Sequence, residues 1–131
     1  MSVGVTRNTA VSEWNLRGLS VNPAAGTNTI NIVPSDSGIM FINKNTSANT
    51  NYVLPTTIAD GDGKMFWFLN AQTSKDMIIT APANTLVADN AVTANSVNMA
   101  ANTVGYGAII VGDGSKYYLF ELGALAWATT T

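Results

Sequence analysis

The sequence predicts an all-β domain, a small sandwich or barrel-like fold of about nine short, mostly antiparallel strands. Short runs of β-branched and aromatic residues recur along the chain, and Gly, Pro, Asn, Asp or Ser stands at nearly every boundary between them. These boundaries fall about 8 to 12 residues apart, which is typical of sandwiches and barrels. No helical period of apolar residues is sustained after position 28.

The chain divides into three segments by pattern. Its 131 residues suit one domain. Residues 27–123 carry the strands and turns and form the predicted β domain. Residues 1–26 end in a loop-forming stretch and predict an N-terminal arm, which is either a short helix over 11–19 or an extended segment. Residues 124–131 predict a C-terminal tail.

Two places in the β domain carry specific expectations. Residues 64–70, the most apolar run in the chain, predict a central strand that is buried on both faces. The loop AQTS that follows predicts a hairpin to residues 75–80. Gly-Asp-Gly-Ser at 112–115 predicts a second hairpin, between 104–111 and 116–122, because glycine readily adopts the positive φ of tight turns.

The composition argues against an enzyme. The chain contains no histidine and no cysteine, which removes Ser–His and Cys–His nucleophile pairs and the ordinary ligands of zinc and copper. Glu13 and Glu121 are the only glutamates, one in the arm and one in the last strand, so no carboxylate pair for glycoside cleavage is indicated. A carboxylate glycosidase is kept as a minority alternative, and no cofactor is expected.

Charged residues are scarce. They make up 11% of the chain, with a net charge of −2, against roughly 25% in an average soluble domain. The six basic residues do not cluster, so we expect no nucleic-acid partner. A neutral surface rich in Asn and Thr is typical of a protein that packs against copies of itself or a partner, since burying charge is costly. A monomer with an uncharged surface is the alternative.

The sequence carries no pattern of a targeting or membrane segment. The first residues lack the basic and apolar regions of a secretory signal. No apolar run approaches the roughly 20 residues of a membrane-spanning helix. We therefore expect synthesis in the cytoplasm and no membrane partner.

Two motifs have both a functional and a plain structural interpretation. Asp60 and Asp62 lie on a glycine-rich turn and are weak candidates for a calcium site, because the third oxygen ligand and distant glutamate of an EF-hand loop are missing. The aromatic residues of 66–68 and 117–120 are candidates for stacking on sugars or bases. Burial in the core is the commoner fate of such side chains.

The order of elements between residues 36 and 122 carries a family resemblance. DSGIMFIN is followed by YVLP, GDGKMFWFLN, an IITAP strand and VGYGAIIVGDGSKYYLFE. This order resembles a β module that recurs in structural proteins of tailed bacteriophages, among them head decoration proteins, head fibres and tail-fibre segments. The resemblance implies a homotrimer on the surface of the virion.

A function follows from this resemblance as an expectation. It implies a capsid decoration (cement) protein that binds the major capsid protein of the assembled head and reinforces the shell by mass action. A tail-fibre module that binds a receptor or glycan is the alternative. In the decoration interpretation the arm anchors the protein through a small set of residues: Arg7, Trp14, Leu16, Arg17 and Leu19.

Overall fold

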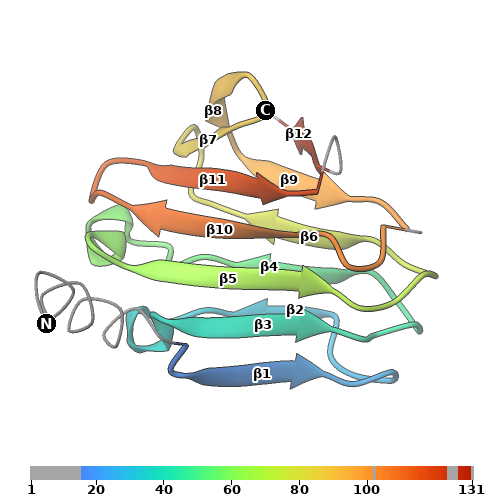
Figure 1. Ribbon diagram of the computed structural model, residues 1–131. Helices are drawn as coiled ribbons and strands as arrows, with labels where there is room; N and C mark the ends of the chain where they lie inside the picture. The colour runs from blue at the N-terminus through green and yellow to red at the C-terminus, as the bar shows by residue number, and fades with distance from the viewer. Residues whose placement is uncertain (1–15, 102, 124–126, 131) are drawn as a thin grey trace, which may run out of the picture.

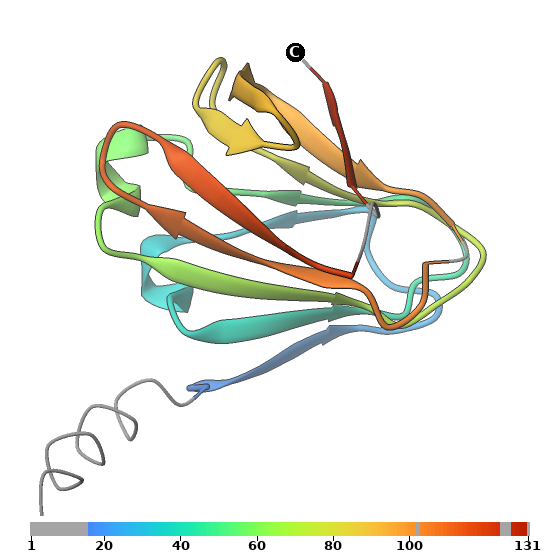
Figure 2. The same cartoon turned by 45° about the horizontal axis from the view of Figure 1, so that its top comes forward.

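The protein is an all-β sandwich (Figures 1 and 2). The computed structural model describes residues 16–101, 103–123 and 127–130, and in this part of the chain twelve strands form two sheets. The predicted all-β class and sandwich architecture are confirmed. The described strands outnumber the expected nine, and five of the ten strand pairings are parallel, so the expectation of mostly antiparallel pairing is corrected.

The two sheets contain seven and five of the described strands. The larger contains β1 (Gly18–Asn22), β3 (Ile39–Asn43), β5 (Met65–Asn70), β7 (Leu86–Ala88), β8 (Ala91–Ala94), β10 (Gly107–Gly112) and β11 (Tyr117–Leu122). The smaller contains β2 (Thr29–Asn31), β4 (Thr50–Val53), β6 (Met77–Thr80), β9 (Ser96–Met99) and β12 (Trp127–Thr130). Their spatial orders are β1-β3-β5-β10-β11-β7-β8 and β12-β9-β6-β4-β2.

Helical structure is limited to two single turns in the described part of the chain. The 3-10 helices η1 (Pro34–Asp36) and η2 (Ile58–Gly61) lie in connections between the sheets. Neither these nor any other helix among the described residues has the length and apolar character needed to span a membrane.

The first six strands alternate between the sheets. β1, β3 and β5 are parallel neighbours in the seven-stranded sheet, and β2, β4 and β6 are parallel neighbours in the five-stranded sheet. Leu19 lies beside Met40, 21 residues later, and Met40 lies beside Trp67, 27 residues later. The chain therefore winds through three turns of a flattened parallel solenoid, and each turn supplies one strand to each sheet.

This winding overturns one predicted hairpin and keeps the other. β5 pairs with β3 and β10, whereas β6 pairs with β4 and β9 in the opposite sheet, so the predicted hairpin across AQTS is wrong. The connection crosses between the sheets instead, and Gln72 shapes it by accepting hydrogen bonds from the backbone N–H groups of Ser74 and Lys75. The predicted hairpin at 112–115 is confirmed, because β10 and β11 pair as antiparallel neighbours.

The sheets extend into the predicted arm and tail. Residues 18–22, assigned to the arm, form the edge strand β1, and Trp127–Thr130, assigned to the tail, form β12 against β9. The predicted alternative of a helix over 11–19 is wrong at its C-terminal end, because residues 18 and 19 belong to β1. Residues 11–15 of that helix lie outside the described residues.

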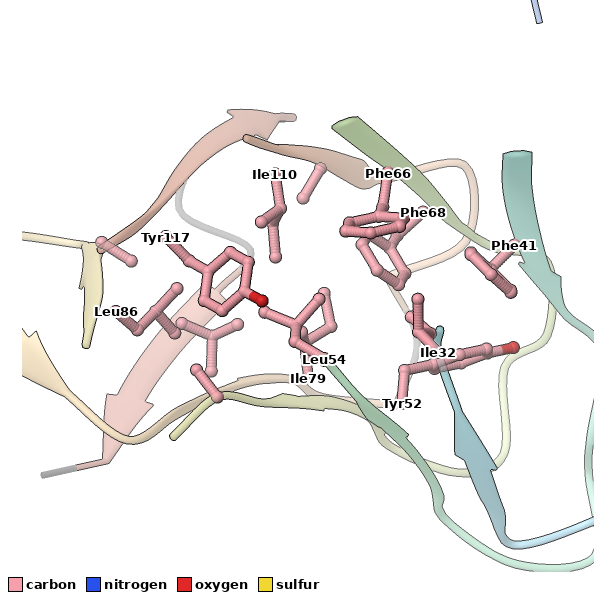
Figure 3. Close-up of a cluster of buried hydrophobic side chains, with 14 of the residues drawn as sticks. Ile32, Phe41, Tyr52, Leu54, Phe66, Phe68, Ile79, Leu86, Ile110 and Tyr117 are labelled. Atoms are coloured by element: carbon pink, nitrogen blue, oxygen red, sulfur yellow. The ribbon is translucent and has the colours of Figure 1, made fainter. Parts of the chain in front are cut away.

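One apolar core fills the space between the sheets (Figure 3). Side chains alternate between the two faces of each strand. Phe66 and Phe68 are therefore buried in this core (Figure 3). Met65, Trp67 and Leu69 lie on the outer face and are only half-buried. The expectation that this strand is buried on both faces is therefore corrected. The largest buried side chains of the core are Tyr52, Tyr117, Phe66, Phe68, Leu54, Met77 and Ile79.

A row of buried amides closes the solenoid at the ends of its parallel strands. Asn22, Asn43 and Asn70 are the last residues of β1, β3 and β5, and they lie in register across the sheet. Asn22 Nδ2 donates to Asn43 Oδ1 at 3.3 Å and to Thr50 Oγ1 at 3.1 Å. Each turn of the solenoid thus repeats the same pattern, an apolar strand followed by an inward-pointing asparagine.

Candidate interaction surface

The outer faces of the two sheets differ in chemistry. The outward positions of the five-stranded sheet are mostly hydroxyl and amide side chains, whereas those of the seven-stranded sheet are apolar. We call the second surface the apolar sheet face and define it by the outward residues of β1, β3, β5, β10, β11 and β7. These are Leu19, Val21, Met40, Ile42, Met65, Trp67, Leu69, Ile109, Val111, Tyr118, Phe120, Leu122 and Val87.

The register of the strands aligns these residues into rows. The central row crosses five strands, and its members are Leu19, Met40, Trp67, Ile109 and Phe120. A second row runs from Val21 through Ile42 and Leu69 to Leu122, and a third from Met65 through Val111 and Tyr118 to Val87. No outward position of these six strands carries a charged residue.

The apolar sheet face is comparable in area to the largest apolar patch of a typical monomer. Five strands about 4.8 Å apart and three rows about 6.6 Å apart give a footprint of roughly 20 by 24 Å, or about 500 Å². The largest apolar patch on a typical monomer is roughly 300–600 Å² and is often functional. Leu19 and Phe120 retain 61% and 58% of their exposure, so the face is open at both ends of its central row.

Such a face is unusual for the exposed side of a sheet. A sheet with one face on the core and the other in water alternates apolar and polar residues. β4 and β6 follow this rule in part, because Asn51 and Thr80 point outward and the Thr80 hydroxyl donates to Asn51 Oδ1 at 2.7 Å. In β3 and β5 both faces are apolar, so the seven-stranded sheet departs from this rule.

Three of the anchoring residues expected from the sequence are described, Leu16, Arg17 and Leu19, and they differ in their contacts. Leu19 belongs to the apolar sheet face, and Leu16 is exposed just before β1. Arg17 serves the chain itself, since its Nη1 donates to the backbone carbonyls of Ser35 at 3.0 Å and Ser37 at 2.6 Å and thereby holds η1 against β1. Arg7 and Trp14 lie outside the described residues.

The two aromatic runs divide between the core and the surface. Phe66, Phe68 and Tyr117 are buried in the core, whereas Trp67 and Phe120 lie on the apolar sheet face. The remaining one, Tyr118, is engaged at the edge of that face, because its hydroxyl donates to Asp113 Oδ2 at 2.6 Å. That bond raises the pKa of Tyr118 and lowers the pKa of Asp113.

Asp60 and Asp62, the weak calcium candidates, lie in a turn between β4 and β5. Asp60 lies in η2 and Asp62 follows it, forming an isolated bridge to Gly112. Across residues 16–101, 103–123 and 127–130, no three carboxylates gather in a way that would hold a metal ion.

The sequence analysis missed Met40 as a surface residue, and it considered Trp67 and Phe120 as stacking platforms but favoured their burial in the core. The signal was present in the strands that contain them, since runs such as Met65–Leu69 are apolar at both odd and even positions. This pattern was interpreted as burial inside one domain. It applies equally to burial of the second face against another protein.

Comparisons with known proteins add no family assignment. No protein-family model matches the chain, and a search of curated proteins finds no match either.

Proposed function

We propose that this chain is a virion structural protein, a homotrimeric capsid decoration protein that binds the assembled phage head and reinforces it. The observation that carries the proposal is the apolar sheet face, a charge-free surface suited to burial against other protein. The order of elements between residues 36 and 122, which resembles phage surface modules, supports the particular setting. Localisation at the capsid surface and contact with the major capsid protein belong to the same proposal.

The size of the face is consistent with stable association. At about 25 cal/mol per Å², burial of about 500 Å² of apolar surface contributes roughly 12 kcal/mol. Loss of translational and rotational freedom offsets about 4–15 kcal/mol of this gain. A single contact of this size is therefore weak or moderate, and in a linked oligomer the arms of several copies add avidity on one capsid lattice.

The alternative of a glycan-binding tail module has less support. Sugar sites combine an aromatic platform with a few convergent polar groups. Trp67 and Phe120 lie in an entirely apolar row, and the nearby Tyr118 hydroxyl already bonds Asp113. Our expectation that the chain is not an enzyme continues to rest on its composition.

Cosedimentation of the purified protein with undecorated heads tests the proposal. We expect binding that saturates at a stoichiometry set by the capsid lattice, and decorated heads that resist heating better than bare heads. Absence of binding at saturating protein would overturn the proposal. Binding to host cells or glycans without binding to heads would favour the tail module.

A truncation tests the expected role of the arm. The structure requires the cut to fall before Leu16, because residues 18–22 form β1 and their removal would strip an edge strand from the sheet. We expect deletion of residues 1–15 to abolish head binding while the thermal unfolding of the β domain is retained. Unchanged head binding by this variant would refute the anchoring role.

A further inference from the structure

We infer that the apolar sheet face is covered by the same face on neighbouring copies of this chain, so that the seven-stranded sheets of an oligomer meet and the five-stranded sheets face water. The inference rests on the proposed function, because it names the partner of the same surface. It makes the oligomer a property of the free protein that exists before any capsid is present.

The chemistry of the face favours an identical partner. Burying an unpaired polar group is costly, and an ordinary protein surface is a little under half polar. Against such a surface, the outward residues of β3 and β5 would displace water from the partner's polar groups without replacing the lost hydrogen bonds. Met40 and Ile42 offer no strong hydrogen-bonding group, and Trp67 offers only its indole N–H as a donor. Two copies of the apolar sheet face have no such mismatch, whichever way they are rotated.

The opposite surface of the sandwich fits the exposed side of this arrangement. The outward residues of the five-stranded sheet include Thr29 and Asn31 on its edge strand, both exposed. On β9, Asn98 Nδ2 donates to Asp76 Oδ2 at 3.0 Å. One outer face is therefore suited to water and the other to protein, and an assembly in which the apolar faces meet leaves only the polar faces outside.

The area of the face meets the requirement for a specific contact. Two footprints of about 500 Å² remove about 1,000 Å² in total, which is the lower limit for a specific protein–protein interface. Trp67 lies in the middle of the central row, between Met40 and Ile109. A large aromatic side chain at the centre of the contact is typical of the residues that dominate binding energy.

The test compares two double variants that introduce the same charge on opposite outer faces. Leu19→Lys with Phe120→Lys places two lysines at the ends of the central row, where both native side chains are more than half exposed, so the core is unchanged. Thr29→Lys with Thr130→Lys is the matched control, at exposed positions on the two edge strands of the five-stranded sheet. Mass is measured by sedimentation velocity and light scattering over a range of concentrations, without heads.

The wild-type protein and the control are expected to have masses that are multiples of the 13.7 kDa chain. Their average masses should decrease on dilution as the oligomer dissociates. The Leu19/Phe120 variant is expected at 13.7 kDa under the same conditions, with native circular dichroism. A buried, unpaired lysine weakens such a contact by roughly a hundredfold or more.

Two results would overturn the inference: a wild-type protein with the mass of a single chain at its highest soluble concentration, or an oligomer that the Leu19/Phe120 variant leaves intact. If the double variant fails to fold, the single variant Leu19→Lys, on the edge strand β1, provides the same test of the oligomer by its mass. A single-chain wild type that still sediments with heads would refute this inference and the homotrimer, and it would leave the proposed binding to heads standing. An oligomer that does not bind heads would support this inference and refute the proposed binding to heads.

Discussion

Two buried tyrosines predict opposite effects of the same substitution. Tyr52 and Tyr117 both have 0% exposure in the core. The Tyr117 hydroxyl donates to the carbonyl of Pro55 at 3.0 Å, whereas the Tyr52 hydroxyl has no hydrogen-bond partner among the described residues. We expect Tyr52→Phe to raise the free energy of unfolding and Tyr117→Phe to lower it.

The magnitudes follow from the hydrogen bonds. An unpaired buried hydroxyl costs about 1–3 kcal/mol, so its removal at Tyr52, with a small void left behind, stabilises the fold by about 1 kcal/mol. Removal of the Tyr117 hydroxyl leaves the buried Pro55 carbonyl unpaired and costs about 1–3 kcal/mol. For 131 residues, with an unfolding entropy of about 2.1 cal/mol/K per residue, 1 kcal/mol shifts Tm by roughly 3–4 °C.

Urea denaturation and scanning calorimetry at equal protein concentration measure both variants. Burial raises the pKa of Tyr117 to about 12 and raises that of Tyr52 further, so neither ionises near neutral pH and the comparison concerns hydroxyl pairing alone. The two variants should differ by about 2–4 kcal/mol, or roughly 7–14 °C in Tm. A Tyr52→Phe protein less stable than wild type by more than about 0.5 kcal/mol would refute the reasoning.

Three further predictions concern the asparagine row, one carboxylate and two glycines. Asn22→Ala removes four hydrogen bonds of a buried amide and should lower the free energy of unfolding by about 2–4 kcal/mol in urea titrations; a loss below about 1 kcal/mol would contradict this. Burial, with a smaller contribution from the Asp89 charge, raises the pKa of Glu121 above the ordinary 4.5. The ionised carboxylate therefore destabilises the fold at neutral pH, and the free energy of unfolding should increase as the pH falls through the raised pKa. Glu121→Gln should be more stable than wild type at pH 7 and should lose this pH dependence. A pH profile of stability that the substitution leaves unchanged would contradict the raised pKa of Glu121. A Cβ on Gly107 would lie 2.1 Å from the Phe68 carbonyl oxygen, so Gly107→Ala should prevent native pairing of β5 with β10. At Gly63 a Cβ would meet nothing within 4 Å, and only the φ of +73° is unfavourable. Gly63→Ala should therefore fold, with a loss of about 1 kcal/mol in the free energy of unfolding. Equal yields of soluble protein from Gly63→Ala and Gly107→Ala would contradict this difference.

The features predicted correctly are those set by neighbours in the chain. The hairpin at 112–115 follows from Gly114, which adopts a φ of +86°, and from Asp113, whose Oδ1 accepts from the N–H groups of Ser115 and Lys116. Both effects act within a few residues, so the local sequence is sufficient to identify them. The all-β class follows in the same way from short apolar runs between turn residues.

The solenoid was missed because its evidence lies between distant residues. Asn22, Asn43 and Asn70 mark equivalent positions in three turns, but the turns differ in length, at 21 and 27 residues. Each turn contains a 3-10 helix, η1 in the shorter and η2 in the longer, and the longer connection around η2 obscures the repeat. A search for internal repeats that tolerates insertions would have found the asparagine at the end of each apolar strand.

The error at β5 and β6 has the same origin. A loop of four residues is the right length for a hairpin, and nothing in AQTS distinguishes a hairpin from a crossing between sheets. The choice depends on partners for β5 in β3 and β10, which lie more than twenty residues away in the chain. Strand pairing is therefore decided by the packing of the whole domain.

The amino-acid sequence by itself determined the chemistry available to this protein: strands bounded by turns, very little charge, and neither imidazole nor thiol. Only the tertiary structure decided where that chemistry lies. Leu19, Met40, Trp67, Ile109 and Phe120 are scattered over a hundred residues of chain and form one row. They do so because strand register places side chains of the same parity on the same face of a sheet. Which of the two apolar faces of a strand enters the core is set by the sheet opposite, and the chain alone does not specify it.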